Sequence, residues 1–329
     1  MINSRQRGMA LLIVLLTIAT LSSLVAFNQQ RWLQTFQRNR TSQFLLQAKW
    51  QLLGAEAIIL SRLSSGKEAV FPLRHSRYLQ LDELRIAYTF SSREVCFNLN
   101  ALLAPHNKYD NKQSTVPISP TPSAAMLHAA ATLPRPGSDT AALSTTRPED
   151  PYPQRVFMHL LHLAGASADQ TIDLLATLTT RNRSHARFVD ASEIRPLIDY
   201  DLWQRLAPFI CALPDNQLRI NLNALTAAQS PLLSALLLET LSPSQAGALL
   251  HSRPAEGWKH ADQLDALWPA DDTFRAAVNQ ARSSLALDGI YYTLRLWLEE
   301  EDRRFQISSQ LLLNKQRLQI TERHYGLSE

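Results

Sequence analysis

The chain has 329 residues, of which 45% are hydrophobic and 19% charged, and a formal net charge of +4. A chain of this length and apolar content can bury a core, and we expect it to fold as more than one module. Its basic residues are spread along the sequence, so neither a nucleic acid nor a strongly anionic surface is indicated as a partner.

The N-terminus carries an uncharged stretch of nineteen residues, Met9 to Phe27, directly after Arg5, Arg7 and Gly8. As a helix this stretch would rise about 28 Å, close to the roughly 30 Å hydrocarbon core of a bilayer. A basic start, an apolar run and small residues before Phe27 are also typical of a secretory signal peptide. Composition alone leaves a permanent anchor and a cleaved signal open.

Two features of the sequence favour an anchor. The apolar run is longer than the usual 7–15 residues of a signal peptide, and the helical pattern continues beyond it. The first proline is Pro72, Gly54 is the only glycine between Gly8 and Gly66, and apolar residues recur every three or four positions up to Ile59. We therefore predict one helix over 9–64, transmembrane at 9–27 and amphipathic afterwards, about 80 Å long.

Charges beside the apolar run do not settle its orientation. Arg5 and Arg7 lie on one side of it, but Arg31, Arg38 and Arg40 lie within reach on the other. Counting positive charges therefore leaves both orientations open.

Alternating apolar residues predict strands at both ends of the remaining chain. In 65–106 they are Leu84, Ile86, Tyr88 and Phe90, then Val95, Phe97 and Leu99, on two strands around a Ser-Ser-Arg turn. In 288–329 they are Tyr292, Leu294, Leu296 and Leu298, then Phe305 and Ile307, with turns at Glu300–Arg303 and near Asn314. We expect these strands to form a single sheet.

The middle of the chain has a different character. Residues 107–153 hold eight of the seventeen prolines and many Ser and Thr, which predicts a loop without regular structure apart from a helical turn at 124–131. Residues 154–287 predict short helices, several opened by Ser, Thr or Asp as N-caps. They are "RVFMHLLHLAG", "SADQTIDLLATLTTR", "SEIRPLIDYDLWQRLAPFICAL", "TAAQSPLLSALLLETL", "SPSQAGALLHSR" and "HADQLDALW".

These elements predict an α+β fold. One antiparallel sheet, built from both ends of the chain and packed on the amphipathic half of the first helix, would bury all the alternating faces. The helical segment 154–287 is then a large, all-helical domain inserted into the sheet domain.

Catalytic and nucleic-acid signals are weak. His159 and His162 lie one helical turn apart, yet no cysteine or carboxylate follows them at metal-ligand spacing. The short helices resemble helix-hairpin-helix modules but lack the paired glycines and lysines that would bind DNA phosphates. We expect neither an enzyme nor a nucleic-acid-binding protein.

The N-terminal "RQRG" followed by "MALLIVLLTIATL" resembles the leader of type IV pilins and pseudopilins, which a prepilin peptidase cleaves after glycine. Downstream, "LLGAEAIIL", "SEIRPLID", "APFICALPDNQLRINLNAL" and "LSPSQAGALLHSRPAEGW" resemble, in order, the minor pseudopilin K family of type II secretion systems. This resemblance implies residues 1–8 as the leader, cleavage between Gly8 and Met9, and a pilin-like fold. Met9 would be the new, methylatable terminus.

The resemblance also implies a place and partners. The chain would be a single-pass inner-membrane protein with a periplasmic globular part, at the tip of the pseudopilus, where it initiates or caps assembly. Other minor pseudopilins and the prepilin peptidase are expected partners, and the secreted substrate and the secretin are further candidates. The alternative is a membrane-tethered periplasmic binding protein that does not polymerise.

Two residue-level expectations complete this interpretation. Cys96 and Cys211, the only cysteines, would form a disulfide in an oxidising periplasm and staple the inserted domain to the sheet domain; two buried free thiols are the alternative. Ile13 takes the place of the glutamate that most pilin-like subunits carry at their fifth residue, which suits a subunit with none above it.

The calcium site of the family is not expected here. The corresponding region keeps only Asp173, Asp190 and Glu193 as acids. Calcium requires six to eight oxygen ligands, several of them from carboxylates. We therefore predict no cofactor and do not transfer this site, calcium being left open by the resemblance alone, and we interpret the acidic run Glu299–Asp302 as a solvated turn.

Overall fold

The computed structural model describes residues 6–64, 73–81, 84–103, 150–183, 187–269, 271–300, 303–315 and 317–327. The chain forms two compact units. Unit 1 consists of Met1–Phe90, Leu294–Leu311 and Gln316–Glu329. Unit 2 consists of Ser91–Thr293 and Leu312–Lys315. The predicted helical turn at 124–131 and most of the predicted loop lie outside the described residues.

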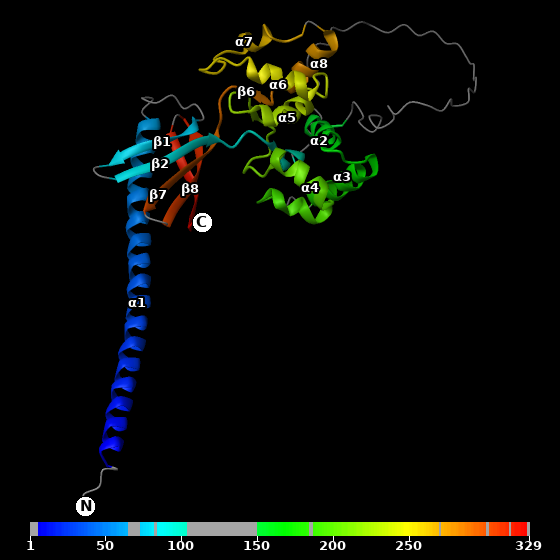
Figure 1. Cartoon of the computed structure of the whole chain (residues 1–329). Coiled ribbons are helices and arrows are strands. Elements are labelled where there is room, and N and C mark those ends of the chain that lie inside the picture. The colour runs from blue at the N-terminus through cyan, green and yellow to red at the C-terminus, as the bar shows by residue number, and fades with distance from the viewer. Residues whose placement is uncertain are drawn as a thin grey trace, which may run out of the picture. The chain divides into compact units, whose positions relative to one another are not determined.

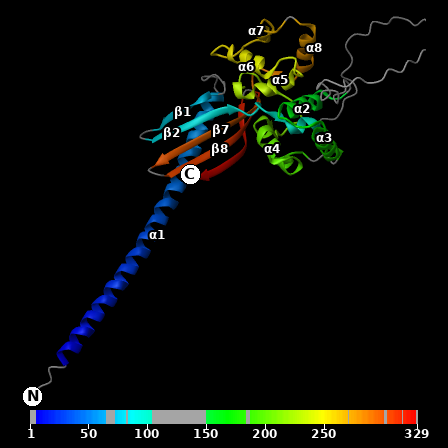
Figure 2. The same cartoon turned by 45° about the vertical axis from the view of Figure 1, so that its right-hand side comes forward.

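A single helix, α1 (Gln6–Ser64), dominates unit 1. Because neither a proline nor a glycine other than Gly54 interrupts it after Gly8, the helix runs on from its apolar first half into its amphipathic second half. The first half projects beyond the sheet in both views (Figures 1 and 2). The buried side chains of the second half recur every three or four residues, at Phe44, Ala48, Leu52, Ala55, Ile59 and Leu63.

In the described residues, five strands form the sheet of unit 1, in the order β1-β2-β7-β8-β9. They are β1 (Leu73–Leu81), β2 (Leu84–Ser92), β7 (Tyr291–Glu300), β8 (Arg303–Asn314) and β9 (Arg317–Leu327). The predicted apolar faces of β2, β7 and β8 are buried, and the second half of α1 packs across the sheet (Figure 2). The predicted long helix on an antiparallel sheet is thereby confirmed.

The first hairpin differs from the prediction. Its strands are β1 and β2, paired antiparallel with Leu79 opposite Ile86, whereas the predicted strand at Val95–Leu99 is not part of the sheet. Instead β3 (Phe97–Asn98) is a two-residue strand in unit 2, parallel to β4 (Ile210–Cys211). Alternation at 95–99 was misleading because both neighbours of each apolar residue are buried as well, including Asn98 and Asn100.

Unit 2 consists mainly of short helices. The α-helices are α2 (Tyr152–Leu163), α3 (Ala168–Arg183), α4 (Tyr200–Leu206), α5 (Ser230–Leu236), α6 (Pro243–His251), α7 (Ala261–Asp265) and α8 (Asp272–Ala281). The 3-10 segments are η1 (Leu99–Leu103), η3 (Ala191–Leu197), η4 (Ala207–Phe209) and η5 (Ala227–Gln229). A second parallel pair joins β5 (Ile220–Asn221) to β6 (Leu285–Ala286), so the unit is not purely helical.

Local sequence determines where these helices begin and end. Ser242 caps α6 by accepting a hydrogen bond from the Gln245 amide, and the Gln245 side chain accepts one from the Ser242 amide in return. The predicted single helix from Ser192 to Leu213 is wrong: it is divided into η3, α4, η4 and β4. Pro196 and Pro208 explain the division, because proline cannot donate the amide hydrogen bond of a continuous helix.

Two segments of unit 2 share the sequence NLNAL, at Asn98–Leu102 and Asn221–Leu225. The second asparagine of each binds backbone in the same way. Asn100 accepts from the Phe188 amide at 2.7 Å and donates to the Phe188 and Leu213 carbonyls. The first NLNAL segment therefore holds the loop at Phe188 and the chain at Leu213, just after β4, in place.

Asn223 repeats this pattern in the second segment. It accepts from the Trp258 amide at 2.8 Å and donates to the Trp258 and Leu287 carbonyls. Gly257, before Trp258, has φ +76°, and a β-carbon there would lie 2.9 Å from Asn223 atoms, so glycine is required. Unit 2 thus contains two similar halves, each organised by one buried asparagine.

Candidate functional site

The first half of α1 is an uncovered apolar surface. Its large side chains from Leu11 to Phe27 are all more than half exposed. Among the described residues, α1 is the one helix long and apolar enough to cross a membrane. Exposure of so many contiguous apolar side chains to water would be strongly unfavourable, which indicates a lipid or protein environment.

The predicted processing and assembly residues lie at the start of this surface. Gly8 and Met9 are within α1, and the preceding residues 1–5 lie outside the described part of the chain. Ile13 is 53% exposed in the same apolar stretch. No carboxylate occurs on α1 before Glu56, so the apolar surface carries no acidic group.

Glu56 is the buried charge of unit 1, with 1% of its surface exposed. Its Oε2 lies 2.9 Å from Nε and 2.7 Å from Nη2 of Arg323 on β9, and Ser309 on β8 donates to Oε1. The hydrogen bond to Glu56 raises the pKa of Arg323. This arrangement satisfies the carboxylate without water and fixes α1 against the last two strands.

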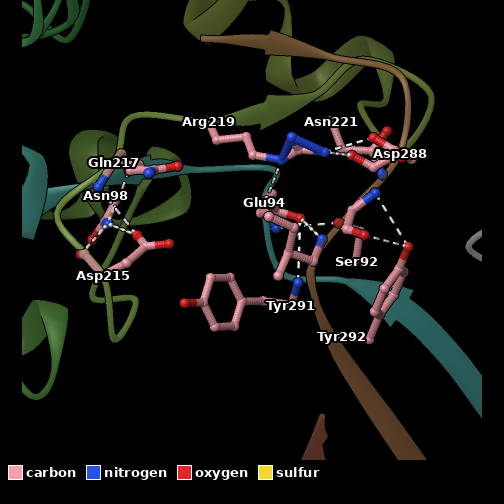
Figure 3. Close-up of polar contacts among 12 residues, drawn as sticks. Ser92, Glu94, Asn98, Asp215, Gln217, Arg219, Asn221, Asp288, Tyr291 and Tyr292 are labelled. Atoms are coloured by element: carbon pink, nitrogen blue, oxygen red, sulfur yellow. Dashed lines mark hydrogen bonds and ion pairs between the residues drawn. The ribbon is translucent and has the colours of Figure 1, made fainter. Parts of the chain in front are cut away.

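A second polar centre lies in unit 2 around Glu94, which is also 1% exposed. Figure 3 shows its carboxylate between Arg219 and the backbone that precedes Tyr291. Glu94 Oε1 accepts from Arg219 Nε at 3.0 Å, and Oε2 accepts from the Ile290 amide at 2.5 Å. Arg219 in turn pairs with Asp288 at 2.5 Å. The segment after β2 is thereby tied to the start of β7.

Burial determines the electrostatics of this polar centre. It raises the pKa of Glu94, and the Ile290 amide and the Arg219 charge oppose that rise without offsetting it. Burial, followed by the charge of Asp215, raises the pKa of Tyr291 to about 12. Tyr291 is therefore neutral at physiological pH. Gly289 packs against the same carboxylate, since a β-carbon there would lie 2.8 Å from Glu94 Oε2.

The structure contains a disulfide between Cys96 and Cys211, with Cα atoms 5.7 Å apart. Both cysteines belong to unit 2. The expectation that the bond staples one domain to the other is therefore wrong. It fastens the start of β3 to β4, within one half of unit 2.

His159 and His162 do meet a carboxylate, although not one nearby in sequence. Both Nδ1 atoms contact Oε1 of Glu239, at 2.8 and 3.2 Å. Glu239 reaches them because Leu238 and Glu239 have positive φ, 52° and 59°, which turns the chain sharply after α5. A partner 77 or more residues away could not be found from spacing on the helix.

The acids of the region that corresponds to the family's calcium site make other contacts. Asp190 accepts from the Ser192 amide, and Glu193 accepts from the Val189 amide, so both carboxylates cap η3. Asp173 lies on α3, and Glu299 pairs with Arg304 at 3.5 Å. In the described part of the chain no three His, Cys, Asp or Glu residues are arranged to hold a metal ion. These residues do not fit a calcium site.

Comparison with known proteins decides the family. The sequence profile of "Type II secretion system (T2SS), protein K" matches residues 220–285. Type II secretion system protein K of Pectobacterium carotovorum is 31% identical over 98% of both chains, and that of Klebsiella pneumoniae 30% identical over 99% of this chain and 98% of its own. This chain belongs to the type II secretion system protein K family.

A solved structure supports the fold of this protein K family member. The chain in "The Crystal Structure of the GspK-GspI-GspJ complex from enterotoxigenic Escherichia coli Type 2 Secretion System" aligns with a TM-score of 0.62 and 24% identity, covering 88% of this chain and all of that one. The sequence-based family assignment is confirmed. Protein K is a minor pseudopilin, a structural and non-enzymatic component of type II secretion.

The family profile covers the second half of unit 2, which begins at the second NLNAL segment. It does not extend to the first half, although the two halves share the asparagine contacts described above. The first half contains residues 104–149 between its NLNAL segment and α2, whereas the second passes directly through η5 to α5. This long insertion separates the elements of the first half in the sequence.

Proposed function

We propose that the chain is the tip subunit of the pseudopilus and that it initiates or caps its assembly. Membership of the protein K family and the three-protein complex of the similar solved structure support this role. The expected partners are the protein I and protein J pseudopilins of the same secretion system. No catalytic step is needed, because the mechanism is association of α1 with the corresponding helices of these partners.

Processing and placement follow from the first residues of α1. Prepilin peptidase would cut between Gly8 and Met9 and leave an apolar helix that begins at the membrane. Residues 9–27 would cross the inner membrane once, with both folded units in the periplasm. The length of the helix and its uncovered first half support this placement.

The observation that carries the proposal is a face of α1 that the sheet does not cover. Leu46 and Trp50 are 61% and 66% exposed, although Phe44, Ala48 and Leu52 beside them are buried against the sheet. Leu46, Trp50 and Gly54 are spaced by four residues, which aligns them along one face of the helix. A β-carbon at Gly54 would meet nothing within 4 Å, so another helix could approach closely there.

The apolar residue Ile13 supports a place at the tip of the filament, where no other subunit lies above this one. The glutamate usual at this place is costly in lipid unless it has a partner, and it is understood to pair with the terminal amine of a neighbouring subunit. An apolar residue avoids that cost and removes that contact. A simple anchor would also be apolar here, so Ile13 supports the tip role only together with the leader.

The second candidate is a tethered periplasmic binding protein that does not polymerise. The test is co-purification of the full chain with protein I and protein J co-expressed from the same system. We expect a stable complex. Gly54→Ile and Trp50→Ser should each weaken the affinity for the partners at least tenfold while unit 1 stays folded. Lys49→Gln is the matched control, because Lys49 lies on the same helix turn but over the Tyr325 ring of β9. Absence of any complex would favour the tethered binding protein.

N-terminal sequencing completes the test of processing. Mature protein from membranes should begin at Met9. A chain that begins at Phe27 would have lost its anchor, and the pseudopilin role would be excluded.

A further inference from the structure

The helix segment that directly follows the apolar run combines aromatic and basic residues. It runs from Phe27 to Arg40 and includes Arg31, Trp32 and Phe36. We propose that this segment, hereafter the collar, binds the phosphate headgroups of anionic phospholipids in the membrane leaflet next to Phe27. The collar would set the depth of the anchor. This inference rests on the proposed function only in requiring residues 9–27 to span a membrane.

The charge of the collar is not balanced along the helix. Arg31 and Arg38 are basic, and the chain has no Asp or Glu before Glu56. Glu56 itself is buried and paired with Arg323. The even spread of charge over the whole chain conceals this local excess. Phosphate groups are the anions that a helix meets where it leaves a bilayer, and Arg binds phosphate with paired hydrogen bonds.

The aromatic side chains of the collar are exposed and mutually arranged. Trp32 is 64% exposed, and its ring stacks on that of Phe36 with centroids 5.4 Å apart and planes inclined by 13°. The Arg31 guanidinium lies 4.6 Å from the centroid of the Phe27 ring. Aromatic rings with a polar edge or a cation above them are typical of the membrane interface, where one end is apolar and the other hydrated.

The distribution of these residues around the helix indicates whether the collar binds lipid or a partner helix. At 3.6 residues per turn, Arg31 and Arg38 lie on one side, whereas Trp32 is rotated by about 100° from Arg31 and Arg40 by about 200° from Arg38. A partner helix would require one continuous face, as Leu46, Trp50 and Gly54 provide. Headgroups contact every side of a helix that passes through their layer. Basic and aromatic residues on all sides of the helix therefore favour lipid over a partner helix.

The axial distances also fit an interface. Arg31 lies about 6 Å and Arg38 about 16 Å beyond Phe27 along the helix axis. Headgroups extend roughly 5–7 Å beyond the hydrocarbon on each side, so Arg31 lies at their depth, whereas the backbone of Arg38 lies beyond them. Long arginine side chains can also reach back toward the phosphates. Arg31 and Trp32 therefore form the centre of the collar.

The first experiment measures depth. The full chain is reconstituted in vesicles of phosphatidylcholine and phosphatidylglycerol whose acyl chains carry bromine near the headgroup. We expect quenching of about one of the six tryptophans, lost in Trp32→Phe and retained in Trp50→Phe. If the natural chain and the Trp32→Phe variant were quenched equally, the proposal would be overturned. Protease protection of the N-terminus in the same vesicles reports the span: a protected N-terminus with unquenched Trp32 overturns the collar alone.

The second experiment measures lipid class. The ratio of phosphatidylglycerol to phosphatidylcholine retained by the chain in polymer-bounded native discs is compared with the ratio in the bulk membrane. Each arginine near an anionic surface favours binding by roughly fivefold. Arg31→Gln should therefore lower the enrichment several-fold, and Arg31→Gln with Arg38→Gln should abolish it. Lys49→Gln, about 27 Å further along the same helix, should not change it. Equal enrichment in all variants would overturn the proposal.

Discussion

The carboxylate of Glu56 on α1 and the guanidinium of Arg323 on β9 are separated by 267 residues and joined by two short contacts, of 2.9 and 2.7 Å. Glu56 is almost fully buried, and the side chain of Arg323 is 36% exposed. The pair connects the helix that carries the membrane segment to the last strand of the sheet. An ion pair therefore adds to the apolar packing that holds α1 against the sheet.

Removal of Arg323 should destabilise unit 1 strongly. Arg323→Met leaves the Glu56 carboxylate buried, with the Ser309 hydroxyl still donating to it, and breaking a buried pair from one side typically costs about 3–5 kcal/mol. Hydrogen exchange of the β8 and β9 amides in the full chain measures this loss. Arg317→Met, an exposed arginine on the same strand, is the control and should change stability by less than about 0.5 kcal/mol.

The double variant Glu56→Met with Arg323→Met tests whether the unpaired Glu56 carboxylate causes the loss of stability in Arg323→Met. Because an apolar pair of similar size avoids the desolvation of both charges, the double variant should recover much of the loss. If the double variant is less stable than Arg323→Met, the two residues act independently and the unpaired carboxylate is not the cause.

The fold of unit 1 was largely predictable from sequence. The helix α1 has no proline and, after Gly8, only Gly54 as a glycine, so its apolar spacing predicts it. Strands β7 and β8 are predicted by their alternation of apolar and polar residues. Strand β1 did not, because "LRHSRYLQL" has Arg, His and Arg between few apolar residues, and only pairing with β2 reveals it. The breaks around Pro196 and Pro208 were predictable from proline chemistry and were missed because the apolar spacing on either side is helical.

Loss of the disulfide should affect unit 2 alone. The bond closes a loop of 115 residues, and the entropic model assigns such a loop about 4.7 kcal/mol. Reduction, or Cys96→Ser with Cys211→Ser, should therefore lower the protection of amides around β3 and β4. Amides of β7 to β9 in unit 1 report whether the effect spreads, and we expect no change at 303–311. Equal thiol labelling of oxidised and reduced protein would show that the bond is not formed.

Removal of Arg219 should make the stability of unit 2 depend more strongly on pH. The folded pKa of Glu94 is raised by burial, so the native state binds this proton more tightly than the unfolded chain. Stability from this group therefore falls as pH rises from the ordinary value of 4.5 to the raised folded pKa. Arg219→Met removes an opposing charge and raises that pKa further.

The expected result is a destabilisation of Arg219→Met that is largest above the raised folded pKa of Glu94 and shrinks as the pH falls toward the ordinary value of 4.5, because Glu94 then takes up its proton in the native state. Denaturant unfolding of unit 2 across this range measures it. Asp288→Asn is the control: Asp288 also binds Arg219, but its side chain is 83% exposed, so its loss should cost little at any pH. If the loss in free energy of unfolding did not change with pH, Arg219 would act through packing rather than through its charge.

The polar centres were not predictable residue by residue. Glu94 meets Arg219 across 125 residues, and Glu239 meets His159 across 80, through turns that periodicity does not describe. One signal was available and unused: the repeated NLNAL at 98–102 and 221–225. It indicates two similar halves in the sequence itself, and the structure shows why each keeps its second asparagine, which binds three backbone groups in a buried site.

Substitution of Ile13 tests the role at the start of assembly. Ile13 would be the fifth residue after cleavage at Gly8, and it is exposed on the apolar half of α1. Ile13→Glu adds a carboxylate whose insertion costs about 2.5–3.5 kcal/mol on translocon-insertion scales, unless it finds a partner such as the terminal amine of another subunit. We expect cleavage to remain intact and entry into the filament to change, because the variant gains the means to dock beneath another subunit. Quantitative labelling of sheared pseudopili should find a single copy of the natural chain per filament, at the tip, and a larger or displaced population for Ile13→Glu. Ile13→Leu, which keeps the position apolar, is the matched control and should behave as the natural chain. A natural chain present along the filament at the level of the main pseudopilin would exclude the tip role, since a subunit that lacks the carboxylate would then be adding beneath others without it.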